Sequence, residues 1–479
     1  MQNVIVACRR LWRLGPLALV GLVLEAFILV QFLTLLAVVV AGGFDWAWAS
    51  ANRAAKPLLM LVAFGAVRAA IPGPPSYLHA LRSTRWCQTL LSVWARVRIP
   101  CALSDALGVV LMTRAATFTA AFLGNVMFPD RQFRPFAMPF ESEKFAEIFA
   151  AWDSGWYFDI ARRGYYFTPD GQSSIAFFPL YPLLMRLVAA PFGASDRAIW
   201  IAGIAISIGA FVAALVTLHT FTERVLGDRA AARRAVLYLA VFPFSLFFTR
   251  VYTESLFFLL TVLAIASAYD RRWWRAGLAG ALAALTRSNG ILVAVPLLCF
   301  ALKDRPSVRA LAPRLAAVTL VPLGLGIYCL YVYSLAGNPL AWLDAQRYWQ
   351  YSVGDLPWRR LLDLVSTIEH RGLYDFFFTS PLAPYQLIHG TVALVVLALV
   401  PMIFRRFGVA LGAYTAVSLL VPLTGSDLQG IGRYMAVVFP IFMLLGSFRS
   451  PRVHEAILVT FSLFLALFLG LFVNGYPLY

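Results

Sequence analysis

The stretch that decides the fold runs from Glu141 to Leu187 and reads ESEKFAEIFAAWDSGWYFDIARRGYYFTPDGQSSIAFFPLYPLLMRL. It is the one long polar and aromatic interruption between hydrophobic runs in the first half of the chain. Within it, the carboxylate of Asp153 is framed by the aromatic residues Trp152, Trp156 and Tyr157. A segment of this kind between apolar runs either docks a partner or builds a site at the membrane surface.

The composition on both sides of this stretch defines the class of protein. Hydrophobic residues make up 61% of the chain and charged residues only 13%, and many separate apolar runs are long enough to span a membrane. An ordinary soluble globule is therefore excluded. The net charge of +17 does not indicate a nucleic-acid partner, because the arginines stand in short clusters at the ends of apolar runs instead of along one basic face.

The apolar runs predict an all-α, multi-pass membrane protein with about 11–13 transmembrane helices. Two runs, 236–269 and 276–302, are expected to fold as hairpins, and 176–192, interrupted by Pro179 and Pro182, is expected to enter the membrane only halfway. Further spans are predicted near 15–41, 57–72, 104–126, 198–220, 315–335, 386–404, 408–424, 431–448 and 454–473.

The arginine clusters set the predicted orientation, because basic residues favour the cytoplasmic ends of spans. They place two large loops outside, 128–175, with short helices, and 336–385. Residues 1–100 are expected to form a membrane hairpin plus a basic interfacial segment, and 101–479 the transmembrane catalytic domain. An Ala- and Arg-rich chain of this kind is expected in a bacterial plasma membrane, with its active site on the outer face.

This orientation gathers the unusual polar residues at the outer boundary of the membrane. They are Asp153, Glu254, Arg287, Asn289 and Arg433. Ionisable groups at membrane depth are costly and tend to be functional, so we expect them to share one site.

Asp153 is the candidate catalytic residue. A carboxylate between aromatic rings, with no cation placed nearby in the sequence, suits a general base. The alternative is a helix N-cap, because Asp-Ser is a common helix start. For Asp159, the arginines Arg162 and Arg163 three and four residues later favour a structural salt bridge.

Glu254 and the two arginines leave two readings open. Glu254 either caps the helix that follows Thr253 or binds substrate through a sugar hydroxyl or a cation. Arg287 and Arg433 suit the phosphate of a lipid-linked donor, because a guanidinium offers two parallel donors to phosphate oxygens. The alternative for both is an internal ion pair with Glu254 or Asp427.

The aromatic residues around Asp153 are candidates for substrate binding. Trp152, Trp156, Tyr157 and, in the FFPLYP run, Tyr181 have rings that stack on sugars, although core packing explains any one of them equally well. Asn289 joins the substrate-binding set as the polar neighbour of Arg287.

The sequence requires no cofactor. The five histidines have no paired spacing, so a metal-histidine site is not predicted, although a divalent cation near Asp153 and Glu254 stays compatible with the sequence. P-loop, Rossmann and GxSxG motifs are absent, which argues against nucleotide hydrolysis and serine hydrolysis.

Four segments, in order, carry a resemblance to a known family: WDSGWYFDIARRGY, AFFPLYPLLMRL, FPFSLFFTRVYTESLFF and ALAALTRSNGIL. Together they resemble the PIG-V-like mannosyltransferases, the GPI mannosyltransferase 2 type, which are integral-membrane glycosyltransferases of the GT-C class. The resemblance covers roughly 104–300, and the residues up to about 100 look like an addition before the family core.

The resemblance implies a polyprenyl- or dolichyl-phosphate sugar as donor and an acidic catalytic base in the first outer loop, a position that Asp153 matches. We therefore expect an inverting transfer of a sugar, mannose first, to a lipid, glycan or protein acceptor. Two alternatives stay open: a transporter or flippase of a lipid-linked anion, and a scaffold subunit without catalysis. The sequence identifies no protein partner.

Overall fold

The structure is a computed structural model. It describes residues 100–128, 148–149, 151–349, 354–379, 383–425, 428, 430–476 and 478, with short pieces between 24 and 64. The chain divides into two compact units, Met1–Ile99 and Pro100–Tyr479. In the first unit, the strands β1 (Phe44–Trp46) and β2 (Ala49–Ala51) pair antiparallel, which the all-α prediction did not include. The hairpin and basic segment predicted within 1–100 lie largely outside the described residues.

The described part of the second unit is built from helices, of which those labelled η are 3-10 helices. As far as residue 302 they are α6 (Cys101–Met127), α8 (Ser154–Arg163), η1 (Ser174–Ala176), α9 (Leu180–Ala189), η2 (Ala190–Phe192), α10 (Asp196–Leu226), α11 (Arg229–Val241), η3 (Pro243–Thr249), α12 (Glu254–Tyr269), α13 (Trp273–Thr286), η4 (Ser288–Val293) and α14 (Ala294–Leu302). The others are α15 (Val308–Val318), α16 (Leu320–Ala336), α17 (Ala341–Gln346), η5 (Arg347–Trp349), α18 (Arg359–Thr379), α19 (Ala383–Phe407), α20 (Val409–Leu423), α21 (Ile431–Ala436), α22 (Phe439–Gly446) and α23 (Pro451–Val473).

Several of these helices are long and apolar enough to cross a membrane, which confirms the multi-pass, helical prediction. Among the described residues they are Cys101–Met127, Asp196–Leu226, Val308–Ala336, Tyr385–Phe407 and Pro451–Val473. Together with η3, α11 would make a further span, bent by 83°.

The other predicted crossings of the second unit are shorter helices or are broken: the predicted span 408–424 is the short helix α20 (Val409–Leu423). The predicted span 431–448 is wrong as a single helix, because α21 ends at Ala436 and α22 begins at Phe439. Pro440 lies in the first turn of α22, where a proline fits the start of a helix but not its interior. The count of full-length spans is therefore lower in the described residues than the sequence predicted.

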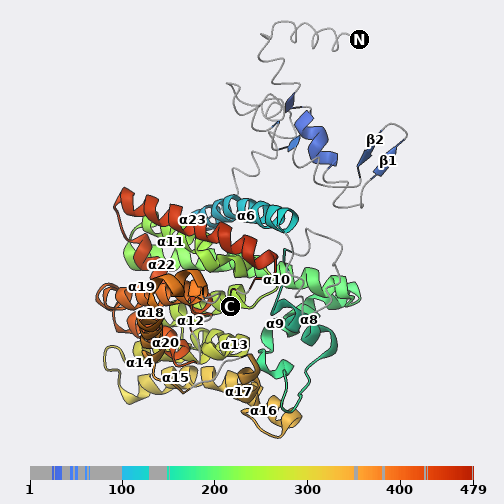
Figure 1. The fold of residues 1–479 in the computed structure, drawn as a ribbon. Helices are drawn as coiled ribbons and strands as arrows, with labels where there is room; N and C mark the ends of the chain where they lie inside the picture. Colours follow the sequence, from blue (N-terminus) through green and yellow to red (C-terminus); the bar gives the residue numbers. More distant parts are fainter. Residues whose placement is uncertain are drawn as a thin grey trace, which may run out of the picture. The chain divides into compact units, whose positions relative to one another are not determined.

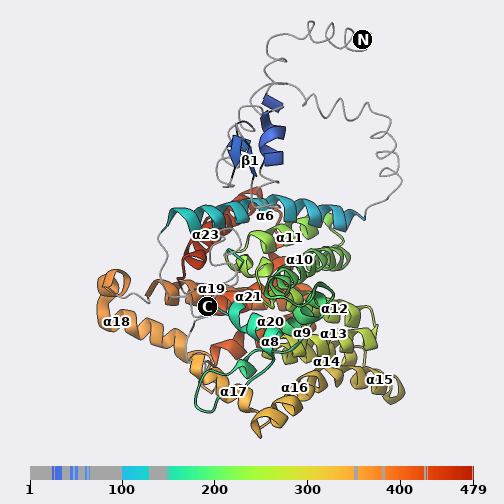
Figure 2. The same ribbon diagram turned by 90° about the vertical axis from the view of Figure 1, so that its right-hand side faces the viewer.

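Across the second unit, each of several helices packs on the next. In Figures 1 and 2, α6 and α23 run side by side at one edge, and α15, α16 and α17 lie at the opposite edge. Between them α10 packs on α12, α12 on α13 and α13 on α16. Glycine permits the α13–α16 contact, because a Cβ on Gly324 would lie 2.4 Å from the Ala281 carbonyl oxygen.

Both predicted hairpins are present as two limbs joined by an irregular turn. The α13–η4 turn holds Arg287 in extended backbone, and a Cβ on Gly290 would lie 2.3 Å from the carbonyl oxygen of Ala283. At the turn between η3 and α12, Arg250, Tyr252 and Glu254 are buried within the protein. The side of the membrane that this turn faces stays a prediction.

Candidate active site

The backbone turns sharply just before Asp153. Trp152 has a φ of 54°, a left-handed conformation that a non-glycine residue adopts only where its surroundings enforce it. Asp153 occupies the N-cap position of α8, but its side chain makes no capping hydrogen bond. Its Oδ2 instead accepts a hydrogen bond from Nη1 of Arg433 at 2.6 Å. The N-cap alternative therefore does not explain this carboxylate.

Arg433 is presented by the short helix α21. The backbone N–H of Gly432 donates to Nδ1 of His389 on α19 at 3.2 Å, and a Cβ on Gly432 would overlap the ring of Phe244. The guanidinium carbon of Arg433 lies 5.0 Å from the ring centroid of Phe247 and 4.7 Å from that of Tyr252. These contacts hold a cation against aromatic faces in the protein interior.

Glu254 joins the two arginines. Its Oε1 accepts one hydrogen bond from Nε of Arg433 and another from Nη1 of Arg287. The side chain of Glu254 is 0% exposed, whereas those of Arg433, Arg287 and Asp153 are 9%, 12% and 22% exposed. The rings of Phe257 and Tyr434 flank Arg287. We call Asp153, Arg433, Glu254 and Arg287, in that order, the charged cluster.

The charged cluster satisfies the requirement that buried charges be paired. Two carboxylates and two guanidiniums cancel, and each charged group has an oppositely charged neighbour. Asp153 comes from the first half of the chain, Glu254 and Arg287 from just past its middle and Arg433 from near its end. The structure thus brings together all four charged residues of the predicted site, and it realises the internal ion-pair alternative with Glu254 for both arginines. Asp427 lies outside the described residues.

The aromatic neighbours of Asp153 on α8 are mostly packed. Trp156 stacks on Phe177, with ring centroids 5.4 Å apart and an interplanar angle of 12°. The hydroxyl oxygen of Tyr157 lies 3.4 Å from Oγ1 of Thr253. Burial, aided by the negative charge of Asp153, raises the pKa of Tyr157 to about 12, so this hydroxyl stays protonated near neutral pH.

Tyr181 and Asn289, the two other residues predicted to contact the substrate, lie outside the group of aromatic residues on α8. Tyr181 is fully buried and its hydroxyl bonds to the carbonyl oxygen of Gly203 at 2.9 Å and to Oγ of Ser207 at 2.8 Å, so a substrate contact through this ring has no support. It packs helix α9 on α10, which is the core-packing alternative. Asn289 is partly buried on η4, two residues beyond Arg287.

The predicted salt bridge of Asp159 is confirmed for one of its two candidates. Nε of Arg163 lies 3.4 Å from Oδ1 of Asp159. Nε of Arg162 instead lies 2.9 Å from Oδ1 of Asp196, at the start of α10. The Asp159–Arg163 pair lies within α8, whereas the Arg162–Asp196 pair ties the end of α8 to α10.

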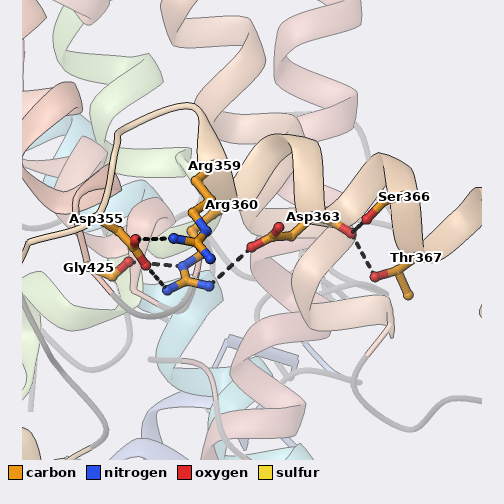
Figure 3. Close-up of polar contacts among 7 residues, drawn as sticks. All are labelled: Asp355, Arg359, Arg360, Asp363, Ser366, Thr367 and Gly425. Carbon is orange, nitrogen blue, oxygen red and sulfur yellow. Dashed lines mark hydrogen bonds and ion pairs between the residues drawn. The ribbon is translucent and has the colours of Figure 1, made fainter.

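The second predicted outer loop is fastened to the segment that leads to α21. Figure 3 shows Arg360 between Asp355, Asp363 and the carbonyl oxygen of Gly425. Its Nε donates to Gly425 at 3.2 Å and its Nη1 to Asp363 at 3.1 Å. The backbone N–H of Asp355 donates to the carbonyl oxygen of Thr424 at 3.1 Å. This network restrains the chain shortly before Arg433.

Sequence reasoning missed the residues that support Arg433. Phe247, Tyr252, Phe244 and His389 lie far from it along the chain, and three of them stand in apolar surroundings where hydropathy alone marks them as core. The one available signal was the polar sequence TRVYTES within an apolar run, which marks an irregular turn but not its contacts.

No metal-binding cluster stands out in the described residues, where no three His, Cys, Asp or Glu side chains lie close enough together to hold an ion. That no cofactor is required, with a divalent cation still compatible, stays a prediction.

The fold and the site define a class: a helical, multi-pass membrane protein with two acidic residues and two arginines in one buried cluster. Residues 107–351, just over half of the chain, match the family model described as mannosyltransferase (PIG-V). The chain belongs to the PIG-V mannosyltransferase family, as its motifs predicted. Asp153, Glu254 and Arg287 lie inside the matched region, and Arg433 lies beyond it.

Individual relatives are similar over parts of their length. The GPI alpha-1,6-mannosyltransferase 2 of Rattus norvegicus is 29% identical over 203 residues, 39% of this chain and 40% of the relative. The GPI mannosyltransferase 2 of Drosophila melanogaster is 25% identical over 256 residues, 47% of this chain and 56% of the relative. The chain thus spans about half the length of these relatives or less. Both come from animals, so the predicted bacterial plasma membrane has no support from them.

Solved structures show a weaker likeness. The archaeal oligosaccharyltransferase AglB from Archaeoglobus fulgidus, in complex with an inhibitory peptide and a dolichol-phosphate, has a TM-score of 0.40 and 13% identity, covering 78% of this chain and 56% of that one. The apo form from the same organism has a TM-score of 0.44 and 12% identity, with the same coverage. Scores of this size do not establish a shared fold, and the GT-C class rests on the family match.

Proposed function

We propose that this chain is a glycosyltransferase that moves mannose from a polyprenyl- or dolichyl-phosphate donor to a hydroxyl group of a lipid-linked glycan, with inversion at the anomeric carbon. The observation that carries the proposal is the placement of Asp153 beside Arg433, joined to Arg287 through Glu254, in a chain of the PIG-V family. The names of the relatives support a glycosylphosphatidylinositol as the acceptor class.

The reaction needs one base and one group that accepts developing negative charge. Asp153 takes the proton of the acceptor hydroxyl while the acceptor oxygen bonds to the anomeric carbon of mannose. The bond from that carbon to the phosphate oxygen breaks, its electron pair goes to the phosphate, and polyprenyl phosphate leaves with one more negative charge. In this proposal, the guanidinium groups of Arg287 and Arg433, which lie in the same charged cluster as Asp153, stabilise this charge.

The residues of the site differ in their access to a substrate. Asp153 and Arg287 are the most exposed members of the charged cluster and stand at its two ends. A donor whose sugar lies at Asp153 and whose phosphate reaches Arg287 would cover the cluster along its length. In this proposal the donor lipid reaches the site from the membrane. The transfer takes place at the outer face of the membrane.

The experiment uses the purified full chain in sealed liposomes with labelled dolichyl-phosphate mannose and a mannosylated glycosylphosphatidylinositol. Label should move to the acceptor, one dolichyl phosphate should be released per mannose transferred, and both should require the acceptor. Movement of the intact donor to the opposite leaflet without acceptor would contradict the proposal and favour a flippase. If no label moves to the acceptor and the donor stays in its original leaflet, a scaffold subunit is favoured.

A further inference from the structure

Glu254 is the member of the charged cluster that a substrate does not reach. Its side chain is 0% exposed, and a single oxygen, Oε1, accepts hydrogen bonds from both arginines. The other oxygen, Oε2, has no hydrogen-bond partner within the described residues. A carboxylate in this position acts on the arginines and not on a sugar.

The orientation of Arg433 depends on this carboxylate. The guanidinium uses Nε for Glu254 and Nη1 for Asp153, so one planar fork spans the two acids. The rings of Phe247 and Tyr252 restrict the plane of the fork, but they do not fix its rotation within that plane. The bond to Glu254 supplies the missing restraint.

We propose that Glu254 is a positioning residue, which holds Arg433 against the Asp153 carboxylate and ties Arg287 to the same oxygen. The inference rests on the proposed function and replaces the predicted contact between Glu254 and a sugar hydroxyl.

Glu254 also determines the net charge of the cluster before and after Asp153 takes the acceptor proton. With both acids ionised the cluster is neutral, so a donor phosphodiester is not held by an excess of positive charge. When Asp153 takes the acceptor proton, the cluster gains one positive charge at the same time as the leaving phosphate gains one negative charge. A cluster without the Glu254 charge would carry an excess positive charge throughout and would retain the phosphate product.

The test compares Glu254→Gln with wild type in steady-state transfer from dolichyl-phosphate mannose to a mannosylated glycosylphosphatidylinositol. Glutamine keeps an oxygen for both arginines and places its amide nitrogen where Oε2 has no partner, so the change removes charge more than shape. We expect kcat to fall by roughly tenfold to a hundredfold, the range in which orienting groups act, while KM for the donor does not rise. The acid limb of the pH–rate profile should move to lower pH, because a negative charge near Asp153 is lost.

Asp270→Asn is the matched control. It makes the same acid-to-amide change in an ion pair with Arg224 that lies outside the charged cluster and is partly exposed. Its kcat, donor KM and pH profile should equal those of wild type. A Glu254→Gln protein with wild-type kcat and pH profile would overturn the inference, as would a rise in donor KM at unchanged kcat, which is the signature of a lost sugar contact.

A second variant covers the case in which Glu254→Gln does not fold. Glu254→Asp keeps the charge but shortens the side chain, so Arg433 loses its restraint, and kcat should fall while donor KM stays level. Wild-type kcat in Glu254→Asp would then overturn the inference. If wild type itself transfers no mannose, the proposed function fails; if wild type transfers and the Glu254 variants match it, only the positioning role fails.

Discussion

Nη1 of Arg433 lies 2.6 Å from Oδ2 of Asp153, across 280 residues of sequence. The aspartate starts a helix in the first large loop, and the arginine stands on a short helix near the end of the chain. The proposed chemistry needs a group that accepts a proton and a positive charge at one place, and this pair provides both. Because Arg433 also binds Glu254, the pair is part of a larger unit and not an isolated salt bridge.

Arg287 should contribute to both donor affinity and turnover, because in the proposed mechanism it binds the donor phosphate and stabilises the charge that develops on it. Replacing it by Gln removes the most exposed guanidinium of the cluster, and KM for dolichyl-phosphate mannose should rise by about tenfold or more, since a charge-assisted bond to an ionised group contributes roughly 1.5–3 kcal/mol. Steady-state kinetics measure this. Arg271→Gln, in an exposed pair with Asp304, is the control and should leave KM unchanged. An unchanged donor KM in Arg287→Gln would remove Arg287 from the phosphate site.

Gly290 should be required for the turn that presents Arg287. A Cβ there would lie 2.3 Å from the carbonyl oxygen of Ala283, so Gly290→Ala forces backbone to move and should lower the free energy of unfolding by about 1–3 kcal/mol. Thermal unfolding in detergent reports the loss, and transfer should fall with it. Gly209→Ala, on α10, adds a Cβ with no atom within 4 Å and should be neutral or slightly stabilising. Equal melting temperatures for the two variants would contradict the observed packing.

The network around Arg360 should hold the second predicted outer loop against the segment before α21. Arg360→Ala removes the hydrogen bond to Gly425 and both ion pairs, so protease cleavage within 336–385 should become faster and transfer should fall modestly. Arg347→Ala breaks an exposed pair with Asp344 in the same region and should change neither. Unchanged proteolysis in Arg360→Ala would show that the loop is held by other contacts.

Tyr157 should not contribute a titrating group to the reaction. Its pKa is raised to about 12, so the hydroxyl is protonated throughout the pH range of an assay, and Tyr157→Phe should leave both limbs of the pH–rate profile in place. The raised pKa has a second consequence for stability. The contribution of the neutral ring is fully present below the unfolded value of 10.0 and is lost as the pH rises through about 12. A shifted alkaline limb in Tyr157→Phe would give Tyr157 a role in proton transfer.

The long spans and the family were predictable from the sequence. Runs such as 104–126, 198–220 and 454–473 became α6, α10 and α23, because a membrane-spanning helix needs an apolar side chain at nearly every position. The local salt bridge of Asp159 with Arg163 was also predictable, because residues four apart share one face of a helix.

The charged pairs were only partly predictable, for a physical reason. The sequence marked Arg287 and Arg433 as costly charges that need an anion, but hydropathy does not show which anion lies beside them. Two carboxylates of the same chain now occupy that position, brought there by the packing of α12 on α13 and of α21 on η3. The break near Pro440 and the burial of the turn at Tyr252 depend likewise on contacts between distant segments.

The central claim is that Asp153 is the base of the transfer, and Asp153→Asn tests it most directly. The purified variant should bind dolichyl-phosphate mannose with wild-type affinity yet transfer mannose at least about a hundredfold more slowly. Asp159→Asn, a nearby acid in a surface salt bridge, should remain fully active. Transfer by Asp153→Asn at the wild-type rate would contradict the account.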